Sequence, residues 1–141
     1  MSGVPGSGKT TWAHEHKPNA LVISADDYFV VNGVYRYASN ESHEAHVECM
    51  GMFLDAIDDG KEIVIDNTNT SVAEVSPYYM VACASGYQST LVTLHCDPDL
   101  AFSRCVHNVP RDVIVRMHDK IKFRRLPLTW RSLEIKHVHV A

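Results

Sequence analysis

The stretch GVPGSGKTTWA, from Gly3 to Ala13, decides the fold class of this chain. It holds a glycine, four residues, a second glycine, a lysine and a hydroxyl residue, the spacing of a loop whose backbone N–H groups wrap phosphates. A glycine-rich turn before an ordinary helix is the competing interpretation. The match is complete over the eight positions and the following residues suit a helix, so the sequence predicts a nucleotide-phosphate site.

The expected ligands of this loop are ATP and Mg²⁺. In loops of this pattern the lysine reaches the β- and γ-phosphates, and the hydroxyl residue after it binds the metal ion. Lys9 and Thr10 hold these two positions. The residues that we expect to bind ATP are Gly3, Val4, Pro5, Gly6, Ser7, Gly8, Lys9, Thr10 and Thr11.

Only two residues, Met1 and Ser2, precede the loop. Loops of this kind normally follow a buried β-strand that lies centrally in a parallel sheet. We therefore expect the first strand of the sheet to be missing from this sequence, either because the start is truncated or because the fold is incomplete.

Length and composition predict one globular domain over residues 1–141. The chain has 141 residues of which 45% are hydrophobic, enough for one core and too few residues for two domains. No apolar run approaches the roughly 18 residues of a membrane span, and the start lacks a signal-peptide pattern. The four cysteines are scattered without metal-ligand spacing. We therefore expect reduced thiols, a cytoplasmic or nuclear location and no membrane partner.

Charge is distributed unevenly along the chain. Residues 1–103 carry 4 Lys/Arg and 14 Asp/Glu, and residues 104–141 carry 9 Lys/Arg and 3 Asp/Glu, so the net charge of −4 combines −10 with +6. The basic segment could clamp ATP or a phosphorylated acceptor, or it could be a solvated helix face. The acidic total argues against a non-specific nucleic-acid binder.

The apolar pattern alternates between strands and helices, as in an α/β fold. ALVIS (20–24), EIVID (62–66) and STLVTLH (89–95) are short apolar runs typical of buried parallel strands. Helices are predicted over 41–59, from Pro98 to about His107, and from about Pro110. Asn32-Gly33 predicts a small hairpin, and SLEIKHVHV (132–140) predicts an edge strand.

Acidic residues follow two of the predicted strands. Asp26 and Asp27 follow the first, and Asp66 ends the second. Because the carboxyl ends of parallel strands share one side of a sheet, these acids are expected near the phosphate loop. There Asp66 could hold the water shell of Mg²⁺, and one acid of the pair could act as a general base. A helix cap, or an Asp/Asn-rich turn closing a strand, is the alternative.

Several ordered motifs together resemble one family. GVPGSGKTTWA, ADDYF (25–29), IVIDNTNT (63–70) and RCVHNVPRDVIVRM (104–117) are similar to the polynucleotide 5′-hydroxyl kinase-like branch of P-loop kinases. The resemblance spans Gly3 to about Arg125. It implies an adenylate-kinase-like, three-layer α/β P-loop NTPase sandwich with a parallel sheet and a short lid at about 104–112.

The resemblance also implies roles for individual residues. Lys9 would bind the ATP phosphates and Asp26 would be the general base. Arg104 would neutralise charge on the transferred phosphoryl group, with a solvent-facing helix arginine as the alternative. Thr10 and Asp66 would hold Mg²⁺, the second through water. For the acceptor side we predict Asp27, Asn67, Asn69 and His46.

This sequence departs from the phage polynucleotide kinases at two places. An arginine that grips the acceptor's 3′-phosphate is replaced by Phe29, and the lid has fewer basic residues. The short lid, DDYF and the NG-x-Y hairpin resemble instead eukaryotic ubiquitin-ligase-binding proteins that carry a kinase-like domain. Aromatic residues at Tyr28, Phe29, Tyr35 and Tyr37 could stack a base or belong to the core.

The sequence therefore predicts an ATP-dependent kinase, a phosphotransferase, that acts on a polynucleotide 5′-hydroxyl or a nucleotide-like end. A small-metabolite kinase with a small hydroxyl acceptor is one alternative. A nucleotide-binding interaction module without turnover is the other. The sequence does not specify an oligomeric state.

Overall fold

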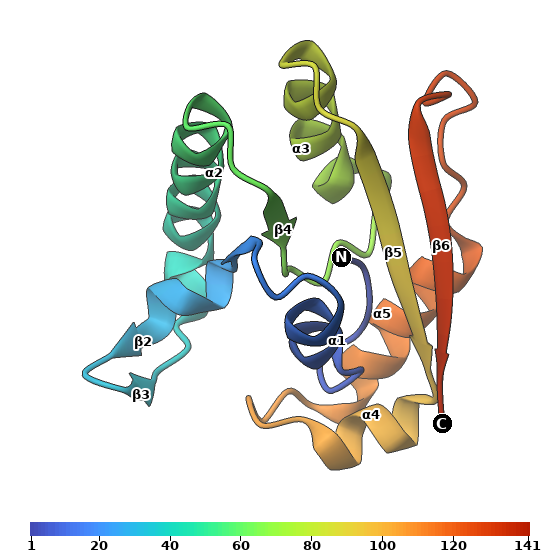
Figure 1. The fold of residues 1–141 in the computed structure, drawn as a ribbon. Coiled ribbons are helices and arrows are strands. Elements are labelled where there is room, and N and C mark those ends of the chain that lie inside the picture. The colour runs from blue at the N-terminus through green and yellow to red at the C-terminus, as the bar shows by residue number, and fades with distance from the viewer. The chain divides into compact units, whose positions relative to one another are not determined.

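Short strands alternate with helices in the computed structural model, which describes residues 1–141 (Figure 1). The α-helices are α1 (Lys9–His16), α2 (Ser42–Asp58), α3 (Val72–Ala84), α4 (Pro98–Arg104) and α5 (Arg111–Phe123). The strands are β1 (Leu21–Ile23), β2 (Val30–Val31), β3 (Val34–Tyr35), β4 (Ile63–Ile65), β5 (Ser89–Cys96) and β6 (Leu133–Val140). Two 3₁₀ helices are η1 (Ala25–Phe29) and η2 (Ser39–Glu41). No helix has the length and apolar character needed to cross a bilayer.

The chain forms two compact units, and its α/β class is as the sequence predicts. The loop unit comprises Met1–Lys9 and Thr68–Ala141, and the acid unit comprises Thr10–Asn67. The boundary falls between Lys9 and Thr10, inside the phosphate-loop motif. The single domain over 1–141 stays a prediction.

In the acid unit, β1 and β4 pair in parallel, with Ile23 opposite Ile65. Both strands are three residues long and apolar, and α2 packs on them through residues four positions apart, Ala45, Cys49 and Phe53, which are buried. Between β1 and α2 lies the predicted hairpin, in which β2 and β3 are antiparallel. Asn32 and Gly33 form its turn with positive φ angles of 53° and 77°, a conformation that these two residue types favour.

In the loop unit, β5 and β6 are parallel neighbours over eight residue pairs, from Ser89 opposite Leu133 to Cys96 opposite Val140 (Figure 1). β5 is largely buried and β6 is mostly exposed, so β6 is the edge strand that the alternating sequence predicts. The core beneath the loop is formed by Val4, Cys96, Ala101, Ile114 and Ile121.

The residues before the phosphate loop pair with β5 at a single point. Ser2 forms an isolated parallel bridge with Thr93, in which Ser2 N–H donates to Val92 O and Leu94 N–H donates to Ser2 O, both at 2.8 Å. Ser2 and Thr93 are almost fully buried. Ser2 therefore anchors the phosphate loop to β5. The bridge is parallel, which is the direction expected of a strand that precedes such a loop.

Two helices differ from the sequence prediction. α4 ends at Arg104, three residues before the expected end, because Cys105 adopts an extended backbone. The sequence analysis predicts no helix over α3, although Ser71 and Glu74 have the Ser-x-x-Glu spacing that signals a helix start. Ser71 Oγ accepts from Glu74 N–H at 3.3 Å and donates to Glu74 Oε1 at 3.0 Å.

Candidate functional site

The phosphate loop depends on glycine at defined positions. Gly6 and Gly8 have φ angles of 79° and 89°, in the left-handed region where side chains are strained. A Cβ atom on Gly6 would lie 2.0 Å from Ala101 O, and one on Gly3 would lie 2.6 Å from Ser7 Oγ. At Gly6 the loop therefore packs too closely against the backbone at the end of α4 for any residue with a side chain.

Lys9 begins α1 and directs its ammonium group back over the loop. Its Nζ donates to Val4 O at 3.1 Å, and Ser7 N–H donates to the same carbonyl at 3.1 Å. Both contacts lie within the loop unit. The position of this ammonium suits binding of a phosphate oxygen, as predicted for Lys9.

Thr10 and Asp66 meet in the acid unit. Thr10 Oγ1 donates to Asp66 Oδ2 at 2.5 Å. Asp66 follows β4 and is buried, and its backbone N–H donates to Ile23 O at 2.8 Å, which fixes it beside β1. The second carboxylate oxygen, Oδ1, is buried and has no hydrogen-bond partner.

A buried carboxylate oxygen without a partner is costly unless a cation or water completes it. Oxygen ligands from a hydroxyl and a carboxylate are those that Mg²⁺ prefers, often through its own waters. Thr10 and Asp66 therefore fit a magnesium ion, and the structure brings together the two residues that the sequence analysis assigned to it.

Asp26 and Asp27 lie in the first turn of η1, directly after β1. Ser24 caps this turn, since its Oγ accepts from Asp26 N–H at 3.2 Å. Tyr35 Oη donates to Asp26 Oδ1 at 3.2 Å. Partial burial raises the pKa of the Asp27 carboxyl, and the nearby carboxylates of Asp26 and Asp66 raise it further. Asp27 thus lies within electrostatic range of two further carboxylates of the acid unit, Asp26 and Asp66.

The predicted acceptor residues Asn67 and Asn69 use their side chains within the protein. Asn67 Oδ1 accepts from Ala25 N–H at 2.9 Å, and Asn67 Nδ2 lies 3.5 Å from Cys49 Sγ. Asn69 Nδ2 donates to Met1 O at 2.8 Å, and the backbone of Asn69 has a φ angle of 43°. These amides hold backbone segments, and their roles toward an acceptor stay predictions. His46 is exposed on α2.

Arg104 ends α4, immediately before the predicted lid. It is exposed, and its Nη2 donates to Ala141 O at 3.3 Å. The segment 105–110 connects α4 to α5, and Val106 within it is 81% exposed. Arg104 therefore adjoins an open connection in the loop unit, which is compatible with its predicted role.

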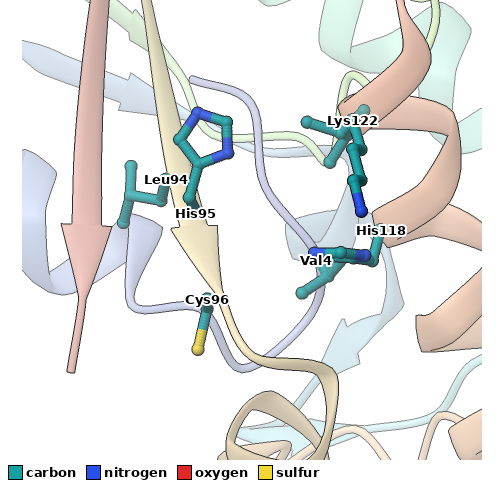
Figure 2. Close-up of a pocket in the computed structure, with 7 residues that line it drawn as sticks. Val4, Leu94, His95, Cys96, His118 and Lys122 are labelled. Carbon is teal, nitrogen blue, oxygen red and sulfur yellow. The ribbon is translucent and has the colours of Figure 1, made fainter.

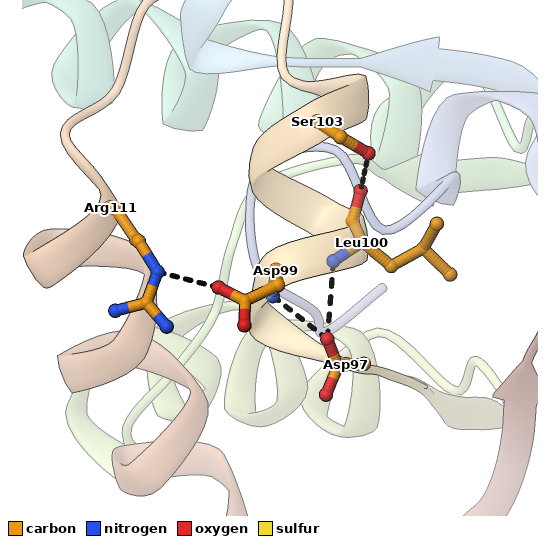
Figure 3. Close-up of polar contacts among 5 residues, drawn as sticks. All are labelled: Asp97, Asp99, Leu100, Ser103 and Arg111. Carbon is orange, nitrogen blue, oxygen red and sulfur yellow. Dashed lines mark hydrogen bonds and ion pairs between the residues drawn. The ribbon is translucent and has the colours of Figure 1, made fainter.

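The two helices that flank this connection are joined at their starts (Figure 3). Arg111 Nε donates to Asp99 Oδ1 at 2.5 Å, so an ion pair links α5 to α4. Asp97 Oδ1 caps α4 by accepting from the N–H groups of Asp99 and Leu100 at 2.9 and 3.2 Å. This cap is the one that the Asp-Pro sequence predicts.

Arg124 is a functional candidate that the sequence analysis missed. Its Nη1 donates to Ser2 Oγ at 2.9 Å and to Asn69 O at 2.6 Å, and its Nη2 donates to Thr93 Oγ1 at 3.2 Å. Burial lowers the pKa of this guanidinium. Arg124 therefore ties the residue before the loop to β5. The sequence contains no signal that singles out Arg124, because it is one of several basic residues in the last part of the chain.

A cavity of about 260 Å³ lies behind the phosphate loop in the loop unit. Figure 2 shows His95 on β5, and His118 and Lys122 on α5, around its rim. Val4 is the loop residue that lines it. The remaining lining residues are Leu94, Cys96 and Ile121. All of its lining residues belong to the loop unit, and none of them is a carboxylate.

Comparison with known proteins identifies the family of this chain. A family model described as "AAA domain" matches residues 1–123. NEDD4-binding protein 2 of Homo sapiens is 31% identical over 129 residues, which cover 83% of this chain and 7% of that protein. The chain thus spans a small part of the length of this curated relative. These findings confirm the P-loop kinase-like resemblance that the motifs predict.

Proposed function

The chain belongs to the family of AAA domains, and from this premise we propose that it is an ATP-dependent kinase that phosphorylates a hydroxyl group. The acceptor that we propose is a polynucleotide 5′-hydroxyl or a nucleotide-like end. The observation that carries the proposal is the pairing of Thr10 with Asp66, whose second carboxylate oxygen is buried without a partner. That pairing occurs directly after a complete phosphate loop.

The loop and its lysine bind and orient the nucleotide in this proposal. The backbone around Gly6 and Gly8 surrounds the phosphates, and Lys9 balances their negative charge. Bound Mg²⁺ supplies charge neutralisation at the β- and γ-phosphates. Thr10 and Asp66 would hold that ion, the second through water.

Asp26 is the proposed general base. Its carboxylate accepts the proton of the acceptor hydroxyl while that oxygen forms a bond to the γ-phosphorus and the bond to the ADP oxygen breaks. Arg104 is proposed to neutralise charge on the transferred group, because it precedes the open connection between α4 and α5. Asp27 is proposed to support the acceptor side of this site.

Phe29 bears on the choice of acceptor. This side chain occupies the position of the acceptor-binding arginine in the phage kinases, and it is buried against Tyr35 and Tyr37, with ring centroids 6.2 and 5.0 Å away. Because Phe29 offers no charge to a 3′-phosphate, a small hydroxyl acceptor is the second candidate. A non-catalytic interaction module is the third candidate, because the relative NEDD4-binding protein 2 is named for binding another protein.

Transfer of the γ-phosphate from labelled Mg-ATP would test these three candidates. The acceptors are an oligonucleotide with a 5′-hydroxyl, the same oligonucleotide already phosphorylated at its 5′ end, and a panel of small hydroxyl metabolites. We expect label only on the 5′-hydroxyl oligonucleotide. Label only on small acceptors would establish the second candidate, and a thermal shift with Mg-ATP but no transfer would establish the third.

A further inference from the structure

The Asp26 carboxylate is held by a residue that the kinase resemblance does not assign. Tyr35 Oη donates to Asp26 Oδ1 at 3.2 Å, from a residue nine positions later in the chain. Both residues belong to the acid unit, so the contact lies within one compact part of the protein.

The β2–β3 hairpin places Tyr35 at this position. Tyr35 lies opposite Val30 in the antiparallel register, and Arg36 N–H donates to Phe29 O at 2.9 Å. The Tyr35 ring meets the Phe29 ring edge-on, with centroids 6.2 Å apart. Because Phe29 ends η1 and Asp26 is in its first turn, the ring contact and the hydrogen bond fix the hairpin to the helix that carries the acids.

A carboxylate rotates freely about its last side-chain bond unless a partner holds it. The first turn of η1 contains two adjacent carboxylates, Asp26 and Asp27, and like charges repel. A hydroxyl that donates to one oxygen of Asp26 opposes that repulsion and selects one orientation. The hydroxyl can hold this orientation only if the Tyr35 ring is itself anchored, and the edge-on contact with the Phe29 ring provides that anchor.

From this geometry we propose that Tyr35 is the positioning residue for the general base, with its hydroxyl holding Asp26 in the orientation that accepts the acceptor's proton. The inference rests on the proposed function. On this proposal the β2–β3 hairpin contributes to phosphoryl transfer through one polar atom, Tyr35 Oη.

Tyr35→Phe removes that atom and keeps the ring that packs on Phe29. We expect kcat for phosphoryl transfer to fall about tenfold, the scale of a hydrogen bond to a charged group, while KM for ATP and the melting temperature stay unchanged. Tyr37→Phe is the matched control, because its ring also packs on Phe29, 5.0 Å away, without a hydrogen bond to Asp26. An unchanged kcat in Tyr35→Phe, or an equal loss in Tyr37→Phe, would overturn the proposal.

A double substitution separates action through Asp26 from a general effect on the fold. Adding Tyr35→Phe to Asp26→Asn should cause no further loss of kcat, since the hydroxyl then has no base to position. A further tenfold loss in the double variant would show that Tyr35 acts elsewhere.

A measurement without turnover distinguishes this inference from the proposed function. In protein labelled with ¹³C at aspartate carboxyl carbons, the Asp26 resonance should move in Tyr35→Phe and not in Tyr37→Phe. If the wild-type protein transfers no phosphate but the resonance moves, the kinase function fails and the contact stands. A resonance that does not move refutes the contact itself.

Discussion

Single residues at the phosphate loop carry distinct tasks that substitutions can separate. Lys9 Nζ already lies over the loop, where it donates to Val4 O. A lysine in this position supplies a point charge to the phosphates and contributes little to the core. Substitution of a single residue here is therefore expected to reduce ATP binding or phosphoryl transfer and to leave the fold intact.

Lys9→Ala should weaken Mg-ATP binding by about tenfold or more and abolish transfer, because a charge-assisted contact to phosphate is lost. Isothermal titration with Mg-ATP measures the affinity, and circular dichroism verifies that the fold is intact. Lys17→Ala is the control, since Lys17 pairs with Glu62 at an exposed site. Unchanged affinity in Lys9→Ala would contradict the assignment of the loop.

Asp26→Asn should leave ATP affinity nearly unchanged and reduce transfer by about a hundredfold or more, the usual scale of general-base loss. The amide keeps the shape of the side chain and removes its basicity. Asp27→Asn provides the comparison and should cost less. If Asp27→Asn is the more damaging change, the two roles are exchanged, and if neither change affects transfer, the proposed mechanism is wrong.

At the scale of elements, histidines join the two long strands. His95 Nε2 and His137 Nδ1 lie 2.8 Å apart, and the His95 ring stacks on that of His139. A hydrogen bond between two imidazoles requires at least one to be neutral. Burial lowers the pKa of His95, and the positive charges facing it from His137, His139, His118 and Arg124 lower it further.

This lowered pKa gives the β5–β6 pair a pH dependence. Below the ordinary histidine value of 6.5 the unfolded chain binds a proton at His95 more readily than the folded chain does. The free energy of unfolding should therefore fall as the pH drops below about 6.5 and should level off once the folded state is protonated as well.

Denaturant unfolding from pH 7.5 to 5.0 measures this effect. We expect His95→Gln to flatten the decline, because the substitution removes the titrating group. His14→Gln, at an exposed position on α1, should leave the decline as it is in the wild type. An identical pH dependence in wild type and His95→Gln would refute this assignment.

At the scale of the whole molecule, charge is segregated along the chain. Residues 104–141 carry a net charge of +6 within a protein of net charge −4. If this segment contacts the phosphates of an oligonucleotide acceptor, binding releases counterions and becomes sensitive to salt. Two or three phosphate contacts would reduce affinity about tenfold between roughly 50 and 200 mM salt.

Fluorescence anisotropy of a labelled 5′-hydroxyl oligonucleotide, measured in a salt series, tests this prediction. Lys120→Gln with Lys122→Gln should reduce the slope of log affinity against log salt. Lys17→Gln with Lys61→Gln, two exposed lysines in the acid unit, is the matched control. Affinity that does not change with salt would exclude phosphate contacts by the basic segment.

The sequence by itself determined the phosphate loop, most strand and helix positions and the acids at the strand ends. Each of these depends on local rules: glycine at positive φ in the loop, short apolar runs for parallel strands, and Asp-Pro or Asn-Gly at a helix start or turn. Gly6, Asp66 and Asn32 are examples at which the local rule and the structure agree.

Only the tertiary structure decided which side chains meet. Tyr35 donates to Asp26, and Asn67 accepts from Ala25. Arg124 donates both to Ser2, which lies 122 positions earlier in the chain, and to Thr93 of β5. Such contacts depend on strand register, hairpin geometry and burial, which set distances between segments that are remote in the chain. A sequence pattern contains periodicity and local propensity, and it carries no record of which buried polar atom a distant side chain will satisfy.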